Sequence, residues 1–127
     1  MRTGTWMAVI LLALVLAVGA ADAWITAGIS QEYTAAAEAM LKAAKKQDWQ
    51  DVLEQEETVL QSWQEKMEWL QMLVDHDALD DVTMALFSVR AAAETEDAAG
   101  AVMGCYQLRE AAAHIHHRDA FSLGNLL

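Results

Sequence analysis

Histidines near the C-terminus have the residue type and spacing that could bind a metal. His114 and His117 are three positions apart, which on a helix brings their side-chain bases within about 5 to 6 Å and suits two-point coordination of zinc or copper. A firm zinc site needs roughly three or four preorganised ligands, and Cys105 lies about two and a half helical turns before His114, out of reach. The simpler interpretation is that these histidines end a helix, where its dipole favours cationic side chains. We therefore predict no metal and no cofactor, and His114 and His117 are the candidates for an alternative function in extracytoplasmic metal binding.

His76 is a candidate general base, because it lies between Asp75 and Asp77 and a carboxylate can orient an imidazole for proton transfer. No serine nucleophile motif accompanies it. The alternative is that Asp77 caps a helix while His76 packs against Trp69 or Met72. We favour this structural interpretation and predict that the protein is not an enzyme.

Clustered acidic residues raise the question of a calcium site. Four aspartates fall within seven residues: Asp75, Asp77, Asp80 and Asp81. The glycine and the terminal bidentate glutamate of an EF-hand loop are both missing, so we predict only weak association of divalent ions with the negative potential. Other acidic side chains are predicted to form the solvated face of one helix: Glu54, Glu56, Glu57, Glu65 and Glu68.

The composition narrows the class of protein. Eight basic and 19 acidic residues give 8 − 19 = −11, which argues against nucleic-acid binding because nothing offsets phosphate repulsion. A chain with no proline and six glycines favours helices over strands and hairpins. The single cysteine, Cys105, excludes an internal disulfide; we expect it to be a small buried hydrophobe, with intermolecular pairing as the alternative.

The N-terminus carries an uncharged apolar segment. Residues 3–21 contain no charge, and nineteen residues in a helix span about 28 Å, close to the thickness of a bilayer core. At the end of the segment, Val18-Gly19-Ala20 and Ala21-Asp22-Ala23 resemble signal-peptidase sites. Against cleavage, apolar residues continue at helical spacing from Trp24 to Lys46. We therefore predict an uncleaved single-pass anchor that contacts the membrane through residues 5–21, with a signal peptide as the alternative.

The orientation of this anchor follows from Arg2, the first positive side chain. By the positive-inside rule the N-terminus lies in the cytoplasm. We therefore predict a bacterial-type cell-membrane protein whose C-terminal domain is extracytoplasmic.

The remaining sequence predicts three further helices. Asp48 is a suitable N-cap for the second, the third follows the Asp75-His76-Asp77 turn, and the fourth begins near Asp97. Residues 43–49 and 92–98 align with each other, each ending one helix and capping the next with aspartate. The predicted fold is all-α: an N-terminal transmembrane helix (1–23) continues into an antiparallel bundle of about four helices (24–118), and a tail (119–127) follows.

Several segments together resemble a known family: Lys46-Gln47-Asp48-Trp49, then Trp63, Met67 and Trp69, then Val74 to Val82, and Leu123-Gly124-Asn125-Leu126-Leu127. In this order they resemble domain of unknown function 4363, a family of short single-pass bacterial proteins with a small extracytoplasmic helical domain. The resemblance covers nearly the whole chain and implies fold and anchoring, but no activity. The alanine-rich composition and the His114-Ile115-His116-His117 cluster depart from the family pattern.

A role in protein interaction or assembly is the function that these observations favour. Trp69 and Met72 lie off the apolar stripe of the second helix, where a partner could contact them. With Trp63 and His76 they are the candidate interaction residues. The predicted partner is another membrane protein or a second copy of this chain.

Overall fold

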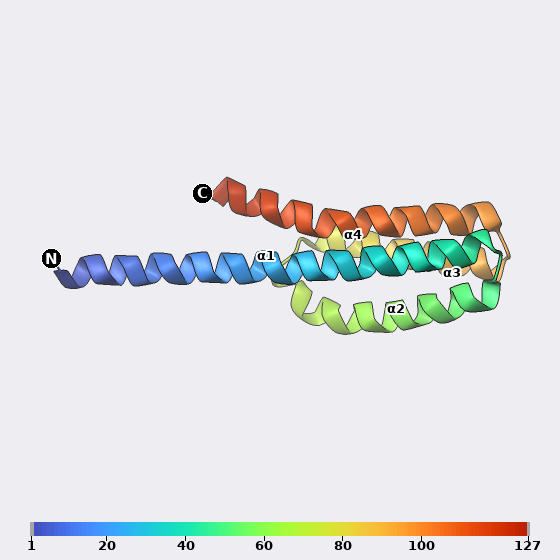
Figure 1. Ribbon diagram of the computed structural model, residues 1–127, viewed down its shortest axis with the longest axis horizontal. Coiled ribbons are helices and arrows are strands. Elements are labelled where there is room, and N and C mark those ends of the chain that lie inside the picture. The colour runs from blue at the N-terminus through green and yellow to red at the C-terminus, as the bar shows by residue number, and fades with distance from the viewer. Residues whose placement is uncertain (1, 127) are drawn as a thin grey trace.

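The computed structural model describes the backbone of residues 2–126 and the side chains of residues 2–115. Over that range the chain forms four helices and no strand: α1 (Arg2–Lys45), α2 (Trp49–Leu70), α3 (His76–Glu94) and α4 (Ala98–Leu126). Consecutive helices run antiparallel (Figure 1). The prediction of a long N-terminal helix that continues into an all-α bundle of four helices is confirmed.

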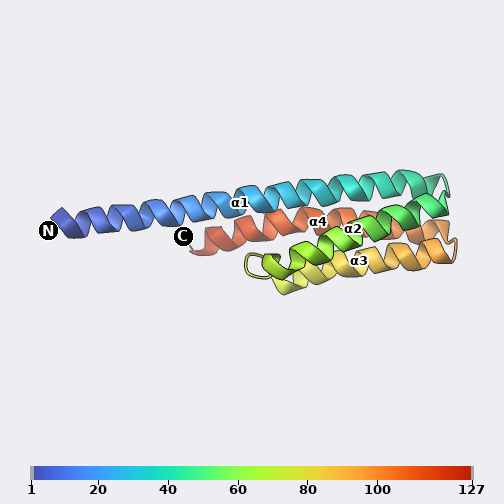
Figure 2. The same cartoon turned by 90° about the horizontal axis from the view of Figure 1, so that it is seen from below.

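The four helices form a closed ring of neighbours. α1 packs against α2 and α4, and α3 packs against the same two helices. The N-terminal part of α1 projects beyond the rest of the bundle, on the side of the α2–α3 turn (Figures 1 and 2). We call this the proximal end, and the end that holds the α1–α2 and α3–α4 turns the distal end.

Helix α1 is continuous from the apolar segment into the bundle. Thr26 is a buried polar residue of this helix. Its hydroxyl is satisfied because it donates to the carbonyl oxygens of Asp22 and Ala23, 2.9 and 3.2 Å away in the same helix. Residues 2–18 are all exposed, and the helix is long and apolar enough to cross a membrane near its N-terminus. A membrane span and a signal sequence share these properties.

The two distal turns have the same design. Gln47 and Glu96 adopt left-handed φ angles of 57° and 53°, and each turn closes with the paired hydrogen bonds of a Schellman motif. Asp48 then accepts from the backbone N–H of Asp51, and Asp97 accepts from that of Gly100. The predicted equivalence of residues 43–49 and 92–98, with an aspartate cap in each, is therefore confirmed.

The proximal turn differs from the prediction in its cap. Helix α3 begins at His76 with Asp75 in the N-cap position, so Asp77 lies in the first turn and is not the cap. The N-cap therefore lies two residues earlier than the sequence suggested. His76 is exposed at the start of α3, so it is not a buried residue of the core, and its expected packing against Trp69 or Met72 stays a prediction.

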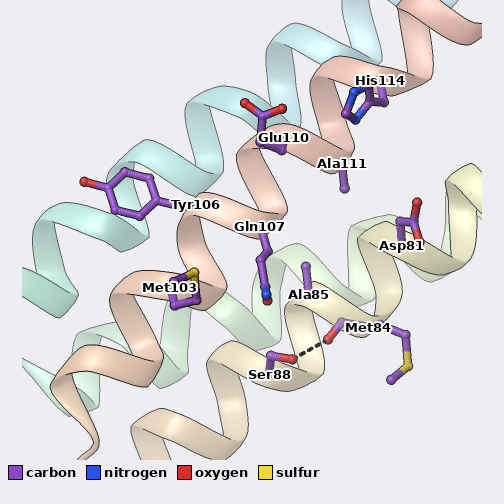
Figure 3. A pocket seen from close by; sticks show the side chains of 10 residues that line it. All are labelled: Asp81, Met84, Ala85, Ser88, Met103, Tyr106, Gln107, Glu110, Ala111 and His114. Atoms are coloured by element: carbon purple, nitrogen blue, oxygen red, sulfur yellow. Dashed lines mark hydrogen bonds between the residues drawn. The ribbon is translucent and has the colours of Figure 1, made fainter.

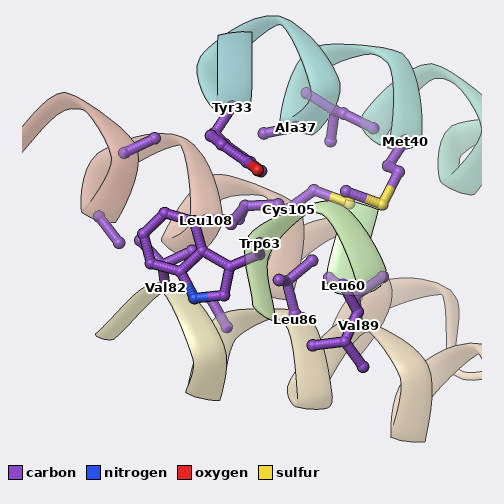
Figure 4. Packing of buried hydrophobic residues seen from close by; sticks show 14 of the residues in the cluster. Tyr33, Ala37, Met40, Leu60, Trp63, Val82, Leu86, Val89, Cys105 and Leu108 are labelled. Atoms are coloured by element: carbon purple, nitrogen blue, oxygen red, sulfur yellow. The ribbon is translucent and has the colours of Figure 1, made fainter. Parts of the chain in front are cut away.

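The core centres on Trp63 of α2, which is fully buried (Figure 4). Its indole ring meets the ring of Tyr33 edge to face, with centroids 5.0 Å apart, and its Nε1 donates to Thr83 Oγ1 at 2.9 Å. One buried indole therefore connects α1, α2 and α3, and its polar atom is satisfied.

Small residues allow α4 to approach α3 closely. A Cβ on Gly104 would come within 2.9 Å of a methyl group of Val89 and 3.2 Å of its backbone nitrogen. The buried alanines Ala92, Ala93 and Ala101 lie at the same helix pair. Close backbone approach leaves little space for larger side chains there.

Candidate functional site

The four candidate interaction residues have different environments. Trp63 is 0% exposed, which corrects its inclusion among them: it lies on the apolar stripe of α2 and no partner can reach it without unfolding the bundle. Trp69 and Met72 are 40% and 86% exposed, and His76 is also exposed. Their role in contacting a partner stays a prediction, and all three lie at the proximal end.

The candidate metal ligands are only partly described. His114 is exposed on α4, whereas the side chain of His117 lies outside the described residues. Among the side chains of residues 2–115, no group of three or more His, Cys, Asp or Glu could hold a metal ion. The metal-binding alternative gains no support from this part of the chain.

A groove of about 520 Å³ lies between α3 and α4 on the outside of the bundle (Figure 3). Ala85 and Ala111 are buried at its base, and Met84 and Met103 line it from the two helices while remaining 62% and 57% exposed. The alanines keep the groove open, and the methionines give it flexible apolar walls. We call it the α3–α4 groove.

Polar side chains lie along the same groove. Asp81 and Glu110 contribute carboxylates, while Gln107 and His114 add further hydrogen-bonding groups. Ser88 donates its hydroxyl to the carbonyl oxygen of Met84 at 3.0 Å, so it is already used within α3. The groove is therefore an apolar surface bordered by negative charge.

Sequence reasoning missed this groove, although a signal existed. Met84 lies between the buried positions Val82 and Ala85, and Met103 between Ala101 and Cys105. Trp69 and Met72 are candidate interaction residues because they are large, apolar and off the buried stripe of their helix. Met84 and Met103 meet the same criterion. What the sequence could not show is that α3 and α4 place them on either side of one groove.

A second hollow, of about 580 Å³, lies at the proximal end. Trp24 and Ile29 of α1 and Trp69 of α2 give it apolar walls, and Gln31 and Glu32 of α1 add polar groups. Trp24 is 79% exposed. The hollow therefore joins the end of the apolar segment to the last turn of α2.

Glu56 corrects the predicted solvated face of α2, because its side chain is fully buried. Arg90 of α3 donates from Nε to Oε2 at 2.9 Å, while Oε1 has no hydrogen-bond partner among the described residues. Burial raises the pKa of the Glu56 carboxyl and outweighs Arg90, which lowers it. Its position between buried Val52 and Leu60, four residues on either side, was the missed signal.

Two other groups have structural roles. Lys66 of α2 donates to Glu32 of α1 at 2.7 Å and lies 5.0 Å from the centre of the Tyr33 ring. Cys105 is 1% exposed, and burial raises the pKa of its thiol to about 11, so it remains a protonated, unreactive core residue at neutral pH. The expected environment of Cys105 is confirmed.

Comparison with known proteins adds one finding. A family model described as "Domain of unknown function (DUF4363)" matches residues 25–126. The match begins just after the apolar segment and covers the whole bundle. Neither a curated protein nor a solved structure matches the chain.

Proposed function

This chain belongs to the DUF4363 family, and on that premise we propose that it is a membrane-anchored binding module. The apolar segment anchors it in the cell membrane as a single pass with a cytoplasmic N-terminus. On the extracytoplasmic side, the α3–α4 groove binds a helix of another membrane protein. The groove is the observation that carries this proposal.

Membrane anchoring is supported by the environment of the apolar segment. Residues 2–18, which make up most of it, are all exposed. Each large apolar side chain left in water forgoes about 1.5 to 3 kcal/mol of burial, whereas a bilayer would accommodate the whole segment. The absence of a break after Ala23 favours an uncleaved anchor.

The extracytoplasmic placement rests on the charge distribution. Arg2 precedes the apolar segment, while residues 48–127 carry four basic and sixteen acidic side chains. The positive-inside rule retains the N-terminus in the cytoplasm. Long acidic segments translocate regardless of their own charge.

A basic amphipathic helix is the partner that the groove fits best. Buried Ala85 and Ala111 permit close approach, and Met84 and Met103 can adjust to apolar side chains of the bound helix. Asp81 and Glu110 at the groove favour a partner with flanking lysine or arginine. A second copy of this acidic chain would meet the same negative charge, so a different membrane protein is favoured.

Binding without catalysis is part of this proposal. Ser88, the hydroxyl in the groove, donates within its own helix, and His76 is exposed in the first turn of α3 and is not among the residues that line the groove. The surface is shaped for helix recognition, and it places no activated nucleophile beside a base.

Site-specific photo-crosslinking in native membranes tests the proposal. A photoreactive residue replaces Met103 in the groove, and the control replaces Gln64, an exposed residue of α2. We expect adducts from position 103 only, and the crosslinked peptide should come from a basic amphipathic helix. Gln107→Trp, which fills the groove from an exposed position, should abolish these adducts.

Three outcomes contradict the proposal. Equal adducts from both positions would mean that the groove has no special role, and no adduct at position 103 would mean that it is empty in the membrane. Adducts of twice the chain mass would identify a second copy as the occupant.

A further inference from the structure

Exposed apolar side chains gather at the proximal end of the bundle. Four residues make up this proximal patch: Trp24 of α1, Trp69 of α2, and Met72 and Leu73 of the α2–α3 turn. Their exposed fractions are 79%, 40%, 86% and 36%. Trp24 and Trp69 line one hollow, and Figures 1 and 2 both place the turn at the end from which α1 projects. The patch therefore includes residues far apart in the sequence.

The exposure of the turn is fixed by its structure. Leu70 and Val74, on either side of it, are buried. The backbone N–H groups of Leu73 and Val74 both donate to the carbonyl of Leu70 at 2.9 Å. A turn held by two core side chains and its own hydrogen bonds keeps Met72 and Leu73 on the outside.

Helix geometry places the patch at the surface of the bilayer that α1 enters. The apolar segment ends at Ala21, and Trp24 follows three residues later, about 4.5 Å along the axis at about 1.5 Å per residue. The polar interfacial layer on each side of the hydrocarbon core is roughly 5 to 7 Å thick. Trp24 thus falls inside this layer, where tryptophan is preferred, and Trp69 lines the same hollow as Trp24.

We propose that the α2–α3 turn inserts Trp69, Met72 and Leu73 into the headgroup–acyl boundary of the same bilayer that α1 spans. This inference rests on the proposed membrane anchor and adds a second lipid contact to it. We choose lipid rather than protein as the occupant of the patch, because Trp24 follows the apolar segment within one helical turn and falls at the height of the interface.

The acidic residues around the patch indicate that apolar insertion, and not attraction to charged headgroups, drives the lipid contact. Glu68, Asp75 and Asp77 are exposed nearby in the sequence, so anionic headgroups would not attract this end. Insertion is driven by apolar side chains, and it should occur in zwitterionic lipid and persist in high salt.

A second contact point would orient the bundle. A helix that leaves the membrane alone can tilt and rotate, whereas α1 and the turn together fix two points on one rigid body. The α3–α4 groove would then face a constant direction and height above the membrane, which suits a partner anchored in the same bilayer.

Fluorescence quenching in lipid nanodiscs tests this inference with the full chain. Met72→Cys carries an environment-sensitive dye, and Met103→Cys, an exposed methionine in the groove, is the matched control. Native Cys105 is not labelled at neutral pH, because it is buried and its thiol pKa is about 11. The discs contain phosphatidylcholine with a spin label near the headgroup end of the acyl chain. We expect the dye at position 72 to lose most of its emission, and the dye at position 103 to lose none.

A second pair of variants separates insertion from folding. Leu73→Asp should remove the quenching at position 72, while Met84→Asp, an equivalent change away from the turn, should leave it intact. The helical circular dichroism of both variants should match that of the parent.

The outcomes distinguish this inference from the anchor. A chain that fails to enter the discs overturns the anchor and the inference together. A chain that enters but leaves the dye at position 72 unquenched overturns only the inference, and energy transfer between dyes on two chains would show that a second copy covers the patch. Quenching only with anionic lipid would show charge-driven adsorption and overturn the apolar insertion.

Discussion

The two parts of α1 contain similar apolar side chains in opposite environments. In the apolar segment every large side chain is exposed, with Leu11 at 64% and Val18 at 65%, whereas Ile29, Tyr33 and Met40 in the bundle are at most 5% exposed. One helix can serve both environments because its backbone hydrogen bonds are satisfied internally in either. The apolar segment is apolar on all faces, while the later part has one stripe that matches α2 and α4.

This difference indicates that the two parts depend on different interactions. The apolar segment depends on the surrounding medium, so it requires only that its side chains be apolar and not that they fit a particular neighbour. The bundle depends on side-chain fit. Changes in one part should therefore leave the other unaffected, and the following predictions test this separation from the largest expected effect to the smallest.

The largest effect is expected for charge placed in the apolar segment. Leu12→Asp with Val15→Asp should cost about 5 to 7 kcal/mol of membrane insertion, at about 2.5 to 3.5 kcal/mol for each charge near the centre. The variant should leave the membrane fraction after a carbonate wash, with the unfolding temperature of its bundle unchanged. Leu12→Ile with Val15→Ile is the control, and a charged variant that stays in the membrane would contradict the anchor.

Loss of the central indole should break the bundle and spare the anchor. Trp63→Ala removes a fully buried side chain, its edge contact with Tyr33 and its hydrogen bond to Thr83. We expect the free energy of unfolding to fall by about 3 to 5 kcal/mol, measured by denaturant titration in detergent micelles. Exposed Trp69→Ala, also on α2, should cost far less. Equal losses for the two variants would argue against a core organised around Trp63.

Gly104→Ala tests the close approach of α3 and α4. The added Cβ would meet Val89 at 2.9 Å, and overpacking of this kind costs about 1 to 3 kcal/mol. At Gly28, an exposed helical position where a Cβ meets nothing within 4 Å, the same substitution should be neutral or stabilising. Thermal unfolding of the two variants checks the prediction, which an unchanged or raised melting temperature for Gly104→Ala would refute.

The smallest expected effect is a pH dependence of the free energy of unfolding that arises from Glu56. Arg90 offsets only part of the cost of burying this carboxyl. Because the folded-state pKa is raised above the ordinary value of 4.5, the folded chain binds this proton more tightly than the unfolded chain does. The contribution of Glu56 to stability is therefore complete below that value and is lost as pH rises through the raised pKa. Glu56→Gln should remove this loss.

The comparison is made by urea titration at several pH values. The free energy of unfolding of the parent should fall, relative to that of Glu56→Gln, as the pH rises above 4.5. Glu65→Gln, at an exposed position of the same helix, is the matched control and should show no such trend. A parent that gains stability relative to Glu56→Gln over this range would mean that pairing with Arg90 outweighs burial.

The sequence alone determined the helices, the turns between them and the family. The continuity of α1 follows from unbroken apolar spacing after Ala23, and Asp48 and Asp97 mark the next helix starts because their side chains accept nearby backbone N–H groups. These are interactions within a few residues, so the sequence contains both partners. The cap of α3 was misassigned by two residues because Asp75 and Asp77 are both suitable and the choice depends on the backbone angles of the turn.

Only the tertiary structure decided which polar residues are buried and which apolar residues are left for a partner. Glu56 is buried because Arg90 lies 34 residues later and reaches it from α3. Met84 and Met103 form one groove because α3 and α4 approach through Ala85, Gly104 and Ala111. The proximal patch includes residues of both α1 and α2 because the two helices pack so that Trp24 and Trp69 line one hollow. Each of these results depends on the distance between helices, which local hydrogen bonding and apolar periodicity leave undetermined.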